Sequence, residues 1–194
     1  MKNMHNDNRP LVLLDVDGVI NDLGPLGGTS RPWNTDVLTS HGYRLHIPDY
    51  MKRLIFALTM CTDVRWCTTW RERANDEIAD HLGIGKLPVV TDGSASKYVD
   101  WKASAARPLV IEALDAGREV FWIEDFYGDP PREQLPAGVT YIDTTVMAPR
   151  GVLTAQDLPR SLVRHLAGWP WPTARETEPT SNSRGGTPWD SDLA

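Results

Sequence analysis

Short apolar runs alternate with amphipathic stretches along most of the chain. Each run is bounded by turn-forming residues and is typical of a buried parallel strand. The pattern predicts five such strands, at residues 11–14, 64–67, 87–90, 120–123 and 139–142. Because helical segments separate the strands, we expect right-handed crossovers and an α/β fold. The predicted architecture is a three-layer α/β/α sandwich around a mainly parallel, Rossmann-like sheet of about five strands.

Helical periodicity falls between the predicted strands. Apolar residues at helical spacing, Met51 to Leu58, predict an amphipathic helix over residues 49–60. A four-residue repeat predicts a second helix over residues 71–82, with Gly83 as its stop. Residues 96–116 also have helical character, and Pro108 predicts a break or restart there.

The chain divides into one domain and two polar ends. Residues 1–9 predict a flexible N-terminus, and residues 10–169 a single catalytic domain. Within that domain, residues 21–47 predict a loop or small hairpin over the site, too short for a separate cap. Residues 154–157 predict a capping box ahead of the last helix. From residue 170 to 194 the composition turns to Pro, Thr, Ser and Gly, which predicts a disordered tail.

Composition excludes several classes of protein. The chain has 194 residues, a formal charge of -6 and a sequence pI near 5.3, so general binding along duplex nucleic acid is not expected. Two cysteines are too few for a disulfide framework, which favours a reducing cytoplasm. No window is apolar for long enough to cross a bilayer, so we expect no membrane partner.

Polar residues that can take part in catalysis or binding follow four of the predicted strands. Because parallel strands finish at one edge of a sheet, these residues should converge there although they are far apart in sequence. Two carboxylates and a glycine directly after a buried strand favour a cation site or a reaction. The candidates are Asp15 and Asp17, Thr68 and Thr69, Lys97, and Glu124 with Asp125.

The same residues resemble the motifs of the haloacid dehalogenase-like phosphohydrolase superfamily. Asp15-Val16-Asp17-Gly18-Val19 matches its first motif, and the strand ending at Thr68 matches its second. Lys97 matches the third, and Trp122-Ile123-Glu124-Asp125 matches the fourth, where Glu124 replaces the more frequent Asp. The resemblance covers about residues 11–169 and indicates a member with a minimal cap or none.

The resemblance implies a Mg²⁺-dependent phosphatase that acts through an aspartyl phosphate. Asp15 would be the nucleophile and Asp17 the general acid and base. Mg²⁺ would be held by Asp15, the backbone carbonyl of Asp17, Glu124 and Asp125. Thr68 and Lys97 would meet the charge of the transferring phosphoryl group, and substrate contacts would come from Thr68, Thr69, Arg71 and Lys97.

Several alternatives stay open at this point. Lys102 competes with Lys97 for the catalytic lysine, and Asp129 competes with Glu124 and Asp125 for the metal. A catalytically silent binding or regulatory protein, or a phosphotransferase of the same chemistry, would have the same residues. An open cleft would admit a bulky substrate such as a phosphorylated end of nucleic acid or a phosphoprotein. A small metabolite fits equally well if the 21–47 segment closes as a lid.

Overall fold

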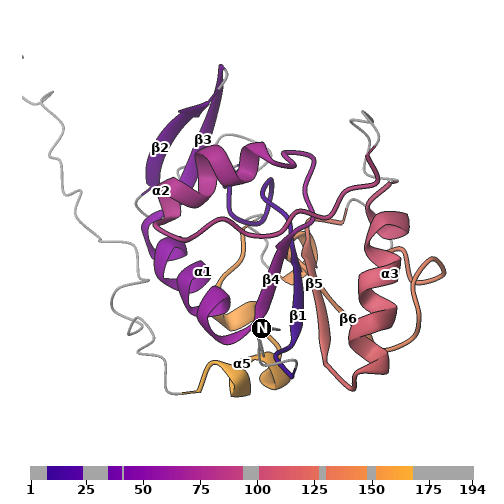
Figure 1. Ribbon diagram of the computed structural model, residues 1–194. Coiled ribbons are helices and arrows are strands. Elements are labelled where there is room, and N and C mark those ends of the chain that lie inside the picture. The colour runs from indigo at the N-terminus through magenta and orange to yellow at the C-terminus, as the bar shows by residue number, and fades with distance from the viewer. Residues whose placement is uncertain are drawn as a thin grey trace, which may run out of the picture.

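A four-stranded parallel sheet forms the centre of the protein (Figure 1). The computed structural model describes residues 8–23, 35–40, 42–93, 101–126, 130–147 and 152–167. The strands lie in the order β4-β1-β5-β6, and every neighbouring pair is parallel. Their bounds are Leu11–Leu14 (β1), Asp63–Trp66 (β4), Val120–Glu124 (β5) and Val139–Asp143 (β6). The predicted α/β class with a mainly parallel sheet is therefore confirmed.

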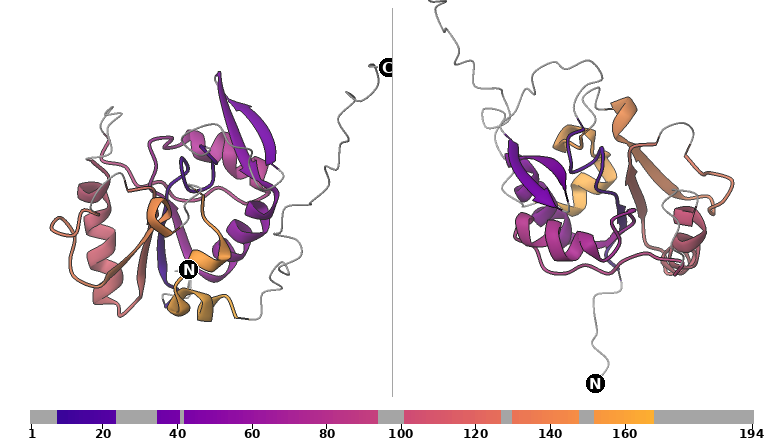
Figure 2. Two further views of the ribbon diagram at one scale, coloured as in Figure 1. Left: turned by 180° about the vertical axis from the view of Figure 1, so that it is seen from behind. Right: turned by 90° about the horizontal axis from the view of Figure 1, so that it is seen from above.

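Helices cover both faces of the sheet, as Figure 2 also shows. On one face, α1 (Asp49–Cys61), the π-helix η1 (Ala74–Ala79), α2 (Asp80–Leu82) and α5 (Arg160–His165) pack against Val12 and Leu14. On the other face, α3 (Trp101–Asp115) packs against Leu11 and Leu13. Successive β1 side chains point to opposite faces, so this strand is buried on both sides. The fold is the predicted three-layer sandwich.

A two-stranded antiparallel hairpin lies beyond the carboxyl ends of the sheet strands (Figure 1). It consists of β2 (Thr35–Ser40) and β3 (Tyr43–Pro48), within the stretch where the sequence predicts a loop or small hairpin. The backbone of His46 in β3 bonds twice to the segment after β1. Its N–H donates to Asn21 Oδ1 at 2.8 Å, and its carbonyl accepts from the Asp22 N–H at 2.8 Å. The hairpin is thereby fixed beside the end of β1.

The third predicted strand is reduced to one bridge. Val89 pairs in parallel with Trp66, through bonds from Trp66 N to Pro88 O (2.9 Å) and from Val90 N to Trp66 O (2.8 Å). Because Pro88 has no N–H, it cannot contribute a donor to a longer ladder. The regular sheet therefore has four strands, and this segment extends its β4 edge by a single bridge.

The break predicted at Pro108 is wrong, because α3 continues from Trp101 to Asp115 without interruption. Proline removes the bond that would reach the carbonyl of Ser104. Both Pro108 and Ser104 are exposed, so water can satisfy that carbonyl and the penalty of the proline is reduced. The first residues of the predicted 96–116 helix, 96–100, lie outside the described part of the chain.

The remaining helical predictions are close to the structure. α1 matches the predicted helix at residues 49–60, and Gly83 ends α2 in the left-handed conformation (φ 71°). The predicted 71–82 helix begins only at Ala74 and has π-type geometry over its first part.

The predicted capping box is present, and it begins a short 3₁₀ helix, η2 (Ala155–Asp157). Pro159 separates η2 from α5. A four-residue helix, α4 (Thr144–Met147), follows β6. Within the described residues, none of the helices has both the length and the apolar character needed to span a bilayer. The predicted ends of the chain, at residues 1–7 and 170–194, fall outside the described residues.

Candidate active site at the strand ends

The register of the sheet brings the predicted site residues to one edge. Leu14 pairs with Trp66 on one side and with Ile123 on the other. The bonds continue one residue further, from Asp15 N to Ile123 O (3.1 Å) and from Cys67 N to Leu14 O (2.9 Å). The next residues of β1, β4 and β5 therefore meet at the same level, as parallel strands require.

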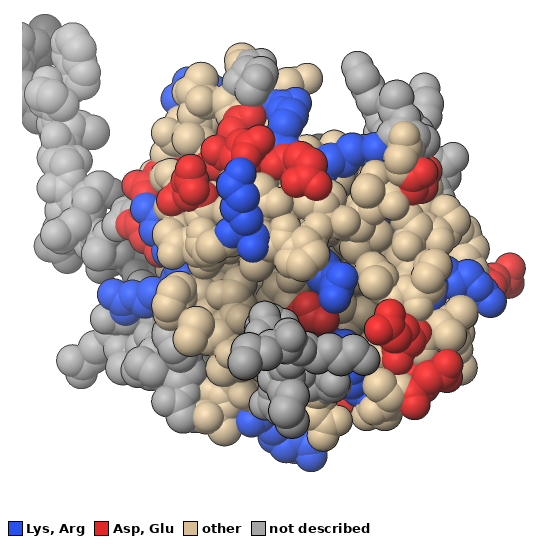
Figure 3. All heavy atoms as spheres, viewed as in Figure 1, with Lys and Arg blue, Asp and Glu red and all other residues tan. Residues whose placement is uncertain are grey.

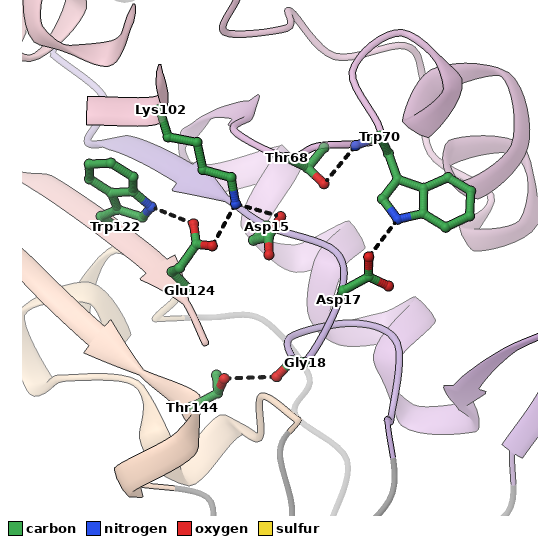
Figure 4. Close-up of polar contacts among 9 residues, drawn as sticks. All are labelled: Asp15, Asp17, Gly18, Thr68, Trp70, Lys102, Trp122, Glu124 and Thr144. Carbon is green, nitrogen blue, oxygen red and sulfur yellow. Dashed lines mark hydrogen bonds and ion pairs between the residues drawn. The ribbon is translucent and has the colours of Figure 1, made fainter. Parts of the chain in front are cut away.

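Three carboxylates and one lysine form the centre of this site, and Figure 4 draws Asp15, Glu124 and Lys102 of these four. Asp15, Glu124 and Asp125 offer carboxylate oxygens that all lie within 4.8 Å of one another. Lys102 Nζ lies 3.1 Å from Asp15 Oδ1 and 2.5 Å from Glu124 Oε1. The other oxygen of Glu124 accepts a hydrogen bond from Trp122 Nε1 at 3.0 Å. Both oxygens of Glu124 are thus held by side chains of the protein.

The lysine at the site is Lys102, the alternative that the sequence ranks second. It lies in the first turn of α3 and is only 2% exposed. Lys97, the lysine that the resemblance favours, is outside the described residues, as is Asp129. Their predicted roles therefore stay predictions. The distinguishing signal was weak in the sequence, because nothing there shows which lysine falls on the buried face of the coming helix.

The charges of this cluster do not balance. Burial works against the charged form of Lys102, but the carboxylates of Asp15 and Glu124 outweigh it and raise the pKa of the ammonium. Burial, followed by the neighbouring Asp15, raises the pKa of Glu124 to about 8 and that of Asp125 to about 7. Three acids facing one cation resist full ionisation, and a further positive charge would remove the conflict.

A divalent cation fits the donor set. The cluster offers only oxygen ligands, which Mg²⁺ prefers, and its excess of negative charge is buried. Asp125 is 9% exposed, so its carboxylate still reaches the solvent side of the site. The predicted contribution of the backbone carbonyl of Asp17 stays a prediction. The residues present can therefore hold the metal that the sequence resemblance implies.

Gly18 is required by the close approach of Asp125. Its backbone is left-handed (φ 68°), a conformation that side chains disfavour. A Cβ placed there would lie 2.3 Å from Asp125 Oδ2, inside any allowed contact. The carbonyl of Gly18 also accepts a 2.7 Å hydrogen bond from Oγ1 of Thr144, which is fully buried. The turn after β1 is thus shaped around the Asp125 carboxylate.

Asp17 has a different environment from the three clustered acids. Its Oδ2 accepts a hydrogen bond from Trp70 Nε1 at 2.9 Å, and its Oδ1 accepts one from Asn21 Nδ2 at 2.9 Å. The sequence favours core packing for Trp70, and Trp70 is indeed buried. Its indole N–H nevertheless points at the predicted acid and base, which periodicity alone does not reveal. Asn21 carries no sequence signal of this role either.

The remaining predicted residues lie around the second strand end. Thr68 is fully buried, and its Oγ1 accepts a 3.3 Å bond from the backbone N–H of Trp70. Thr69 is exposed and Arg71 is partly buried. Arg71 has a left-handed backbone (φ 52°), and its guanidinium lies 4.6 Å from the ring centre of Trp101. This sharp turn separates the buried threonine from the exposed side chains that follow it.

Comparisons with known proteins give distant structural neighbours. No protein-family model matches the chain, and no curated protein matches its sequence. A Vibrio cholerae structure provisionally named as a 3-deoxy-D-manno-octulosonate 8-phosphate phosphatase is 18% identical, with a TM-score of 0.37 over 82% of each chain. A Legionella pneumophila structure provisionally named as a HAD superfamily (subfamily III A) hydrolase is 23% identical. Its TM-score is 0.38, over 82% of this chain and 80% of that one. Because both scores are low, function must be argued from the site itself.

Proposed function

We propose that the protein is a Mg²⁺-dependent phosphatase that hydrolyses phosphomonoesters through a phosphorylated Asp15. The observation that carries this proposal is the gathering of Asp15, Lys102, Glu124 and Asp125 around one point at the strand ends. Bound Mg²⁺ would neutralise the acids and draw charge from the phosphate oxygens. Without a cation, a carboxylate nucleophile and an anionic phosphate would repel each other.

The proposed reaction uses the two aspartates of the first motif, Asp15 as nucleophile and Asp17 as acid and then base. A carboxylate oxygen of Asp15 attacks phosphorus, and the bond from phosphorus to the ester oxygen breaks. Asp17 gives its proton to that leaving oxygen, and then accepts a proton from the water that hydrolyses the acyl phosphate. The hydrogen bonds from Trp70 and Asn21 hold both oxygens of Asp17, which supports this positioning.

The remaining roles concern the catalytic lysine, the metal ligands and the groups that stabilise the transferring phosphoryl group. We assign the catalytic lysine to Lys102, because its ammonium already contacts the nucleophile Asp15. Glu124 orients that ammonium, since its two oxygens are taken by Lys102 and Trp122. Of the pair Glu124 and Asp125, we therefore assign Asp125 as the metal ligand, together with Asp15. The hydroxyl of Thr68 and nearby backbone N–H groups would meet the charge of the transferring phosphoryl group.

Hydrolysis of p-nitrophenyl phosphate, with Mg²⁺ and then with EDTA, tests the proposal. We expect Mg²⁺-dependent turnover that Asp15→Asn lowers by about 10⁴-fold or more. Asp17→Asn should lower it by about 10²- to 10⁴-fold without a comparable loss of Mg²⁺ binding. The matched control is Asp115→Asn, at the exposed end of α3 away from the site, which should leave turnover unchanged.

Three results would contradict the proposal. Equal turnover by the Asp15→Asn variant and the parent would remove the nucleophile. Mg²⁺ binding without any turnover on aryl phosphates, nucleotides or sugar phosphates would favour a binding or regulatory protein. Transfer of phosphate to an alcohol in preference to water would instead indicate a phosphotransferase of the same chemistry.

A further inference from the structure

A cleft of about 690 Å³ opens beside Asp17. Its described walls come from three segments: the turn after β1, strand β3 of the hairpin, and the loop that follows β4. Among its described lining residues are Asp17, Thr69 and Arg71, which the sequence predicts for the site, but none of the four clustered residues Asp15, Lys102, Glu124 and Asp125. Asp17 is the acid that would protonate the leaving oxygen. The cleft therefore opens beside the group that would protonate the leaving oxygen.

The described lining of the cleft is mainly positive, whereas the cluster of Asp15, Glu124 and Asp125 is negative. Among its described lining residues, Asp17 is the only acid, whereas three are arginines: Arg44, Arg71 and Arg73. Arg44 stands exposed on β3. Arg73 has a side chain that is 45% exposed, and its contact with Glu77 is long at 3.4 Å. These two guanidinium groups remain accessible to an anion, and guanidinium groups bind phosphate oxygens in pairs.

Arginines on a surface are usually solvated and bind nothing. The case for Arg44 and Arg73 therefore depends on their positions relative to Asp17. Arg73 stacks over the ring of Trp70 at 4.9 Å, and the same Trp70 donates to Asp17. Arg44 lines the same cleft from β3, and it follows Tyr43, whose ring meets Trp70 edge-on at 6.3 Å. Arg73 is thus attached to the residue that holds the proposed acid, and Arg44 lines the same cleft. Figure 3 shows basic and acidic side chains mixed over the face seen in Figure 1, without a continuous basic band.

We propose that the natural substrate carries a second phosphate on its leaving group, bound by Arg44 and Arg73 in this cleft. The inference rests on the proposed function and names its substrate class. Attack by Asp15 would release the alcohol, which takes its proton from Asp17, and water would then hydrolyse the aspartyl phosphate to inorganic phosphate and free Asp15. The second phosphate would stay on the product. The protein would therefore convert bisphosphates into monophosphates.

Paired substrates that differ by one phosphate test this proposal. The pairs are adenosine 5′-monophosphate with adenosine 3′,5′-bisphosphate, and fructose 6-phosphate with fructose 1,6-bisphosphate. We expect kcat/KM to be about tenfold or more higher for the bisphosphate of a pair, the effect of one additional charged hydrogen-bonded contact. Preference in both pairs would identify the second phosphate alone as the determinant. Preference only in the nucleoside pair would identify a nucleotide, with its base against Tyr43.

Arginine variants locate the preference. Arg44→Ala and Arg73→Ala should each reduce the ratio of bisphosphate to monophosphate kcat/KM severalfold, and the double variant should bring it close to one. Arg164→Ala, on the exposed side of α5, is the control and should leave the ratio unchanged. A ratio near one in the parent, or a high ratio that survives the double variant, would overturn the proposal.

Binding separates this inference from the proposed function. Calorimetry on the Asp15→Asn variant, with Mg²⁺ present, should give tighter binding of adenosine 3′,5′-bisphosphate than of adenosine 5′-monophosphate by about tenfold. Arg44→Ala and Arg73→Ala together, added to that variant, should remove the difference. Equal affinities would reject the second-phosphate site. If the parent hydrolyses no phosphomonoester, the proposed function is wrong. The difference in affinity measured by calorimetry then still tests the second-phosphate site on its own.

Discussion

The strand-end cluster and the neighbouring cleft are built in opposite ways. In the cluster, Asp15, Lys102 and Glu124 are each no more than 5% exposed, and short contacts join them. In the cleft, Tyr43 is 64% exposed, and Arg73 contacts its nearest acid at 3.4 Å. Buried polar networks allow few arrangements, whereas solvated side chains on weak pairs move at little cost. The difference separates a rigid cluster, where we propose that the reaction occurs, from an adaptable surface that we propose for the leaving group.

Asp17 lies on the border between these two regions. One of its oxygens is held by Trp70 of the cleft wall and the other by Asn21. Asn21 Oδ1 also accepts the backbone N–H of His46, so one side chain connects the hairpin to the acid. A movement of the hairpin would therefore reach Asp17 through Asn21.

Removal of the buried lysine should have the largest effect on stability. Lys102→Ala leaves Asp15 and Glu124 buried without their ammonium partner, which costs about 3–5 kcal/mol of unfolding free energy. Turnover should fall by about 10²- to 10³-fold, since a charged donor at the phosphoryl group is lost. Urea unfolding in EDTA and in Mg²⁺ measures the first effect, and the added cation should recover part of the stability.

The exposed pair of Lys86 and Asp76 supplies the matched control. Its contact is 2.9 Å, but both side chains are largely exposed. Lys86→Ala should leave turnover unchanged and stability nearly so, because water screens such pairs. Similar losses in the two alanine variants would show that burial does not distinguish the cluster from the surface.

A glycine substitution gives a sharper comparison within the site. Gly18→Ala and Gly83→Ala both place a side chain on a left-handed backbone, at φ 68° and 71°, which costs about 1–2 kcal/mol each. Only at Gly18 would the new Cβ meet a carboxylate; nothing lies within 4 Å at Gly83. We therefore expect both variants to be destabilised, while only Gly18→Ala lowers turnover, by about 10²-fold through displacement of Asp125.

Two measurements check this difference. Thermal unfolding reports the shared backbone strain, and titration with Mg²⁺ reports the carboxylate displacement. Full activity and Mg²⁺ affinity in Gly18→Ala would show that Asp125 is not fixed by the turn and would remove it from the proposed ligand set.

The sequence contained enough to predict the layers of the fold. The strand runs at residues 11–14 and 120–123 are fully apolar, so their burial and the convergence of their ends follow from pattern alone. Local exceptions depended on surroundings. Pro108 is tolerated because it is exposed, and the 87–90 run forms only a bridge because Pro88 lacks a donor.

Side-chain direction limited the prediction of the site. Asp15, Glu124 and Asp125 end strands, and strand ends have a predictable position. Lys102 is placed by the rotation of α3, and Trp70 by a turn with a left-handed residue after it. A periodicity that marks Trp70 as buried carries no information about where its N–H points. The acids were therefore predictable, and the groups that orient them were not.

The pH dependence of the Mg²⁺ effect should be the smallest of these changes. Burial, then Asp15, raises the pKa of Asp125 to about 7, so the folded state keeps a proton that the unfolded state has lost. Without metal, stability should therefore fall as pH rises from the ordinary range of an aspartate toward 7. Mg²⁺ binds the deprotonated carboxylate, so the increase in Tm on adding Mg²⁺ should be several degrees larger at pH 8 than at pH 6. Differential scanning calorimetry in Mg²⁺ and in EDTA measures both trends.

An Asp125→Asn variant should lose most of the Mg²⁺ effect and its pH dependence. An increase that is equal at both pH values would mean that the cation does not compete with a proton at this carboxylate.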